Sequence, residues 1–195
     1  MAVGPVDVYI IGFPGNKFTG RIAPAIMELV DNGTIRVLDL LFVMKDADGV
    51  VTSLRAADLD EEGAAFVSID VTQPGALGAE DADEVSDDLP ANSSALLVAF
   101  ENAWAGKLVD ALQAADLDEE GAAFVSIDVT QPGALGPEDA DEVSDDLPAN
   151  SSAMLVAFEN AWAGKLVDAL QAADAFVIDS IRIPVDVVTA ALDAG

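Results

Sequence analysis

Apolar and polar residues alternate along the chain in blocks that predict strands and helices in turn. The stretch VDVYIIGF at 6–13 is β-branched and aromatic, which is typical of a buried strand. Residues 20–31 carry apolar side chains every three or four positions and predict a helix that Thr19 caps and Gly33 ends. A second apolar stretch at 34–44 predicts the next strand.

The pattern continues with a hairpin and three further elements. DADG at 46–49 predicts a turn, and VVTSL at 50–54 predicts the returning strand. The alternation in AAFVSIDVT at 64–72 indicates a strand, and the acidic stretch 80–89 indicates a short helix. SSALLVAF at 93–100 then predicts an apolar strand.

Further elements are predicted after residue 101. Residues 102–115 predict a helix that places Trp104 and Leu108 on one face. Near the C-terminus, 175–183 predicts a strand, and Pro184 begins a final helix.

The middle of the chain is a direct repeat of 58 residues. Residues 59–116 and 117–174 are identical except at Ala79/Pro137 and Leu96/Met154. Identical segments have identical preferences, so each copy can occupy the same place in a fold, but only one can do so at a time. The repeat divides the chain into four parts: an N-terminal βαβ half with a hairpin strand (1–58), the first repeat (59–116), the second repeat (117–174), and a closing strand with a C-terminal helix (175–195).

The number of strand–helix–strand halves decides the predicted fold class. Two halves, 6–44 and 151–183, interlock in a ferredoxin-like, split βαβ sandwich, which is an α/β (α+β) fold with an antiparallel sheet backed by helices. Residues 93–129 form a third half, so the sandwich is extended by a duplicated strand–helix–strand unit. Three halves do not pair off within one chain, and the open edges of the third must be covered. We therefore expect a homo-oligomer formed by a domain swap, a cage or a filament. The alternative is an elongated sheet that accommodates the insert within one chain.

Three stretches of the sequence carry a family resemblance: GPVDVYIIGFPGNKFTGRIAPAIMELVDNGTIRVLDLLFVMKDADG, ANSSALLVAFENAWAGKLVDAL and RIPVDVVTAAL. They resemble a family of short, acidic, mostly actinobacterial proteins, domain of unknown function 6325, which is distantly similar to the uncharacterised bacterial family 1269. The resemblance implies no activity, because none is established for the family. Members of the family carry the middle segment once, and this chain departs from them by its duplication.

The charge and composition limit the partners. The chain has 36 acidic and 8 basic residues and a formal net charge of -28, which repels nucleic acid and anionic lipid. Cysteine and histidine are absent, which excludes disulfides, thiolate catalysis, histidine-based triads and the common zinc sites. No apolar stretch is long enough for a membrane span, and no basic stretch precedes an apolar one at the N-terminus. We therefore expect a cytoplasmic protein that binds neither nucleic acid nor cofactor.

The loop at 14–21 offers the clearest candidate ligand site. It contains Gly15-x4-Gly20 between a strand and a helix, but a phosphate-binding loop would continue with lysine and a hydroxyl residue, and here Arg21 follows. Lys17 and Arg21 could still bind an anion beside the helix N-terminus. The alternative interpretation is a turn whose two cations offset nearby carboxylates.

The acidic clusters are weaker candidates. EDADEVSDD occurs at 80–88 and 138–146, but one short helix cannot surround a calcium ion with six to eight ligands. These clusters predict solvated faces with at most weak binding of divalent cations, and no metal site. DADG lacks the spacing of a calcium loop and is interpreted as a hairpin turn.

Four apolar side chains are the predicted anchors of packing or of an interface: Trp104, Leu108, Trp162 and Leu166. The sequence therefore favours a non-enzymatic structural or interaction protein that self-assembles through the duplicated half-domain. The alternative is a small-ligand or anion-binding regulatory module that uses the loop 14–21. No catalytic residue is predicted, because no motif requires one.

Overall fold

The computed structural model describes residues 3–18, 20–59, 63–114, 133–149, 151 and 153–193. Internal contacts divide the chain into two units. One comprises 1–114 and 162–195 and contains the sheet, and the other comprises 115–161. Thr19, the predicted helix cap, and the strand predicted at the end of 93–129 lie outside the described residues.

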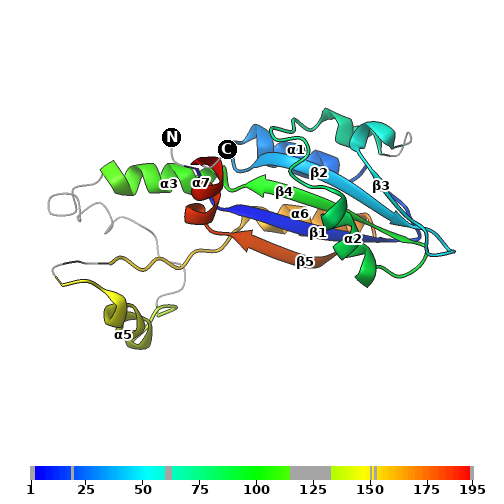
Figure 1. Cartoon of the computed structure of the whole chain (residues 1–195). Coiled ribbons are helices and arrows are strands. Elements are labelled where there is room, and N and C mark those ends of the chain that lie inside the picture. The colour runs from blue at the N-terminus through cyan, green and yellow to red at the C-terminus, as the bar shows by residue number, and fades with distance from the viewer. Residues whose placement is uncertain are drawn as a thin grey trace. The chain divides into compact units, whose positions relative to one another are not determined.

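Within the described chain, five strands form one antiparallel sheet in the order β3-β2-β4-β1-β5 (Figure 1). The strands are β1 (Val6–Pro14), β2 (Arg36–Lys45), β3 (Val51–Leu54), β4 (Ser93–Glu101) and β5 (Phe176–Ile183). β1 and β2 both pair antiparallel with β4, so they run parallel to each other. β5 pairs with β1 at one edge, and β3 pairs with β2 at the other. The prediction of a mixed α+β protein with an antiparallel sheet is confirmed.

The helices of the described chain follow the predicted order. They are α1 (Ala23–Asp31), α2 (Ala79–Asp88), α3 (Ala103–Ala114), α5 (Pro137–Asp146), α6 (Trp162–Ala172) and α7 (Val185–Asp193), with two short 3-10 helices, η1 (Ala56–Asp58) and η2 (Ala64–Ser68). α1 begins three residues later than predicted and has a proline in its first turn. It ends as predicted, because Gly33 adopts a left-handed φ of 64° and its N–H donates to the carbonyl oxygen of Val30.

The sheet buries a hydrophobic cluster on each face. One face of β4 presents Leu96 and Val98 to the cluster that includes α1 and α6. The opposite face presents Leu97 to a second cluster, in which Ala82 and Val85 of α2 take part. Figure 1 shows α2 in front of the sheet and α1 with α6 behind it. The alternation along β4 therefore gives one strand two buried faces, as a central strand requires.

The prediction of a strand at 64–72 is wrong. Residues Ala64–Ser68 form the 3-10 helix η2 instead. Phe66 in η2 and Ile69 directly after it are both buried and lie three positions apart, which matches the three residues per turn of a 3-10 helix and not the period of two of a strand. The ring of Phe66 packs edge-to-face on Phe42 of β2, with ring centroids 5.1 Å apart.

The prediction of a strand at the start of 151–183 is also wrong. Among the described residues of 151–159, none is in a strand, although the same sequence forms β4 in the first copy. The position between β1 and β2 is already filled by β4. The helix and the closing strand of that half are confirmed as α6 and β5.

Candidate interaction surface

β4 shows how the repeated strand sequence packs when it is inside the sheet. It pairs with β1 on one side and with β2 on the other over its whole length. The side chains of Leu96 and Val98 are 0% and 3% exposed. A strand with partners on both edges and both faces has no surface left for another partner.

The second copy of this sequence is exposed. Met154 and Val156, which correspond to Leu96 and Val98, are 43% and 54% exposed. Residues 153–159 therefore present apolar side chains that the fold buries in the other copy. Apolar surface of this kind marks an interaction site more often than scattered single residues do.

For the helices the burial is reversed: the helix of the second copy is buried, and the helix of the first copy is more exposed. α6, from the second copy, buries Leu166 and Leu170 in the core, where α6 packs against α1. Leu108 of α3, which corresponds to Leu166, is 39% exposed. The sheet thus takes its central strand from the first copy and its covering helix from the second.

The predicted anchor Trp162 packs in the core. Its ring lies edge-to-face on Phe100 of β4, with ring centroids 5.9 Å apart. In the first copy, Trp104 Nε1 donates a hydrogen bond of 3.2 Å to Asn102 Oδ1. Of the four predicted anchors, the structure places Trp162 and Leu166 against the sheet, and it does not bring Leu108 to the same cluster.

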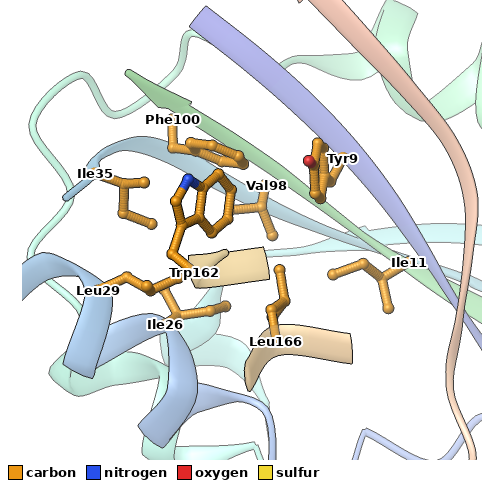
Figure 2. A pocket seen from close by; sticks show the side chains of 9 residues that line it. All are labelled: Tyr9, Ile11, Ile26, Leu29, Ile35, Val98, Phe100, Trp162 and Leu166. Carbon is orange, nitrogen blue, oxygen red and sulfur yellow. The ribbon is translucent and has the colours of Figure 1, made fainter. Parts of the chain in front are cut away.

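Figure 2 shows the cavity beside Trp162, where side chains of β1, β4, α1 and α6 converge. Its volume is about 10 Å³, which is the space of a single water molecule. Trp162 Nε1 is buried and has no hydrogen-bond partner among the residues that the structure describes. Burial raises the pKa of the Tyr9 phenol at the rim of the cavity, and the charge of Asp7 raises it further. A cavity of this size serves packing and has no room for a substrate.

A buried carboxylate joins the two ends of the chain. Asp7 in β1 accepts hydrogen bonds from Arg182 Nε at 2.7 Å, from Arg182 Nη2 at 2.8 Å and from Asn102 Nδ2 at 2.9 Å. The hydrogen bond to Asp7 raises the pKa of the Arg182 guanidinium above its ordinary value. The network ties β5 to β1 and to the residue that follows β4. Since both carboxylate oxygens are occupied, it is a structural cluster.

A second buried carboxylate positions α2. Asp39 lies at a bulge in β2 and accepts hydrogen bonds from Arg55 Nη1 and from the backbone N–H groups of Gly75 and Leu77, at 3.0, 3.0 and 2.9 Å. Arg55 Nη2 donates to the carbonyl oxygen of Leu77 at 2.7 Å. The pair fixes the loop that leads into α2, and no pattern in the sequence indicates it.

The two cations of the predicted ligand loop lie on one groove. Lys17 and Arg21 line an open groove of about 510 Å³ with Gln171 and Asp174. Arg21 Nη1 donates a hydrogen bond of 2.9 Å to the carbonyl oxygen of Ala172 at the end of α6. The negative end of the helix and the carboxylate of Asp174 reduce the positive potential that an anion would meet.

The edge strand β5 presents a second exposed apolar surface. Phe176, Val177, Ile178 and Ile181 are 54%, 40%, 37% and 50% exposed. The apolar pattern of 175–183 predicted a strand, but it contained no sign that this strand lies at an edge. β3, at the other edge, is only four residues long.

Metal-binding clusters and membrane spans are both absent from the part of the chain that the structure describes. No group of three or more histidine, cysteine, aspartate or glutamate side chains among these residues is arranged to hold a metal ion. No helix of the described chain has the length and apolar character needed to cross a membrane.

Comparison with known proteins gives a family. The sequence model of DUF6325, a family of unknown function, matches residues 2–127. The chain belongs to the DUF6325 family. The match extends from β1 through α3 and ends inside the second copy, so the structure takes α6 and β5 from beyond the matched range. No curated protein and no solved structure matches the chain.

Proposed function

We propose that this DUF6325 member is a non-enzymatic structural or interaction protein that self-assembles through its duplicated half-domain. The observation that carries the proposal is the exposure of Met154 and Val156, in a sequence whose first copy is buried. The sheet takes its central strand from the first copy, together with η2 and α2, and takes α6 from the second copy, so the strand segment of the second copy and α3 of the first copy have no place in this sheet and its core. A second chain supplies the apolar surface that covers them, in a domain swap, a cage or a filament.

The polar clusters support a non-enzymatic role. Asp7 and Asp39, the two buried aspartates of the described chain, are each engaged in several hydrogen bonds with fixed parts of the fold. Neither aspartate lines the cavity beside Trp162 or the open groove beside Lys17 and Arg21.

The strand order supports a finer assignment of the fold. We infer that β2-β4-β1-β5 is a ferredoxin-like, split βαβ sheet, extended by the hairpin strand β3. β1–α1–β2 forms one half. The other half consists of β4 from the first copy, α6 from the second copy and β5 from the C-terminal segment, so the duplication interrupts this half.

Light scattering of the purified chain tests the proposal. We expect a mass that exceeds the 20.0 kDa of the monomer and grows with protein concentration. A chain that lacks 59–116 retains one complete copy of the repeat and should form a smaller assembly with the same circular dichroism per residue. A compact monomer of the full chain at every concentration would contradict the proposal.

A second candidate function rests on the groove beside the loop 14–21. We infer an anion-binding regulatory site there, because Lys17 and Arg21 line the same open groove. Inorganic phosphate and nucleotides should raise the melting temperature, and Lys17→Ala should abolish the shift. Arg21→Ala is a separate variant, because Arg21 also binds the end of α6. The absence of any shift with phosphate or nucleotide in the unaltered chain would contradict this candidate.

A further inference from the structure

The outer edge of β5 has the properties of a docking site for a strand. β5 is eight residues long, pairs with β1 on one side only, and exposes Phe176 and Ile181 by about half. A strand edge carries backbone N–H and C=O groups in a row, which is a ready template for another extended segment. No strand of the described chain lies beyond β5.

Residues 153–159 have the properties of the strand that such an edge binds. Their sequence matches that of β4 except at Met154, and β4 forms antiparallel ladders with two different neighbours. In β4, therefore, this sequence pairs as a strand on both of its edges. The stretch 151–158 carries no charge, and β5 carries one aspartate and one arginine. Glu159 is the one charged residue of the donor segment, at its end, so in a chain whose net charge is -28 the contact avoids most of the repulsion between chains.

Chain connectivity argues that the donor and the acceptor belong to different molecules. Two residues separate 159 from α6, and only three separate α6 from β5, so the chain reverses direction between α6 and β5. A strand 153–159 placed outside β5 in the same chain would therefore have to run parallel to β5, joined through α6. With α6 on the same face as α1, this crossover would have the opposite hand to β1–α1–β2. About 98% of such crossovers are right-handed, so two crossovers of opposite hand in one sheet are unfavourable. This argues against placing 153–159 beside β5 of the same chain.

We propose that residues 153–159 of one chain add to the outer edge of β5 of a second copy of this chain. This inference rests on the proposed self-assembly and names its contact. The donor segment and the acceptor edge are different surfaces, so the contact is heterologous: the chain that donates keeps a free acceptor edge, and the chain that accepts keeps a free donor segment. Repetition of the contact gives a ring if the rotation closes and a filament if it does not.

Matched single substitutions separate the donor from the acceptor. Val156→Lys places a charge in the donor segment, and Ile181→Lys places one on the acceptor strand, where lysine is a common blocker of edge pairing. Val50→Lys is the control, because Val50 is 59% exposed and precedes β3 at the opposite edge of the sheet. Sedimentation velocity should show that each of the first two variants is a monomer and that the control assembles like the unaltered chain.

Mixing the two variants gives the decisive measurement. Val156→Lys retains its acceptor and Ile181→Lys retains its donor, so an equimolar mixture should form a one-to-one dimer of twice the 20.0 kDa chain mass and nothing larger. A mixture that stays monomeric would overturn the inference, as would assembly of either variant alone. Should Ile181→Lys fail to fold by circular dichroism, Val177→Lys on the same strand replaces it.

The outcomes also separate this inference from the proposed function. A full chain that is monomeric at all concentrations would overturn both. Assembly that disappears when 59–116 is removed but survives both lysine substitutions would support self-assembly through the repeat and overturn the contact between 153–159 and β5.

Discussion

The first copy of the repeat gives the sheet its central strand, whereas the second copy gives it a covering helix and leaves its own strand segment exposed. Leu96 of the first copy is fully buried and Met154 of the second is 43% exposed. The helices show the reverse, because Leu166 of the second copy is buried and Leu108 of the first is half-exposed. Neither copy is used as a whole, so the unit that folds is the element and not the repeat.

Connectivity explains the choice of copy. α6 is joined to β5 by three residues, Ala173, Asp174 and Ala175, so the second copy's helix is held beside the strand that follows it. The first copy begins directly after β3 and η1, and its η2 inserts Phe66 into the core next to β2. Shorter connections cost less entropy to close, and each place in the fold is therefore filled by the copy that is nearer in sequence.

The largest effect is expected when both copies lose their strand. When Val98→Asp is combined with Val156→Asp, either copy of the strand would place a carboxylate in the core between β1 and β2. Burying an unpaired carboxylate there should lower the free energy of unfolding by about 3 kcal/mol or more. Urea denaturation measures it. A double variant as stable as the unaltered chain would mean that β4 is not the central strand.

Arg182→Ala should have the next largest effect, because it weakens the attachment of β5, through which the second copy joins the sheet. Asp7 would stay buried with one of its two charged or polar partners removed. Since Arg182 is half-exposed and water can replace part of the interaction, we expect a loss of about 2 kcal/mol. Lys165→Ala, which breaks the exposed pair with Glu28, is the control and should change stability by less than about 0.5 kcal/mol. Equal effects of the two substitutions would contradict the anchoring role of Asp7.

Val98→Asp alone should cost less than the double variant. The intact segment 153–159 has nearly the same sequence as β4 and can take its place, at a cost set mainly by the altered loop lengths. We expect a loss of about 1 kcal/mol, and Val156→Asp alone should change stability by less than about 0.5 kcal/mol. A double-mutant cycle over the urea midpoints measures the difference. Additive effects would show that the two copies do not exchange.

The smallest effect concerns the pKa of Tyr9, which lies where the first copy's strand meets the second copy's helix. Burial is the main cause of its raised pKa, so the neutral phenol is favoured in the folded state. Its contribution to stability is present below the ordinary pKa of 10.0 and is lost as the pH rises through the folded pKa. Trp162→Ala should lower the pKa of Tyr9 toward its ordinary value, because Trp162 and Tyr9 line the same cavity.

The chain offers a direct readout of that pKa, since Tyr9 is its only tyrosine and tyrosinate absorbance reports it alone. Trp104→Ala is the matched control from the first copy, and it should leave the titration unchanged. A shift with Trp104→Ala and none with Trp162→Ala would reverse the assignment of the two helices.

The amino-acid sequence alone was enough to set the local structure of the acidic helix in each copy. In α2, the N–H of Gly78 donates to Asp81 Oδ2 at 2.7 Å, and in α5 the N–H of Gly136 donates to Asp139 Oδ2 at the same distance. Bonds between residues three positions apart need no distant partner, so identical sequences form them identically. Local preferences of the same kind predicted the α+β class, the hairpin and most helix positions.

Which copy occupies which place depends on packing and connections across the whole chain. No pattern in the sequence distinguishes 93–100 from 151–158, and none links Asp7 to Arg182 across 175 positions. The same limit explains η2, where the core required side chains three positions apart in a stretch that reads as alternating. The position between β1 and β2 can hold only one strand. Because the two copies have nearly the same strand sequence, the connections of the whole chain decide which copy supplies it.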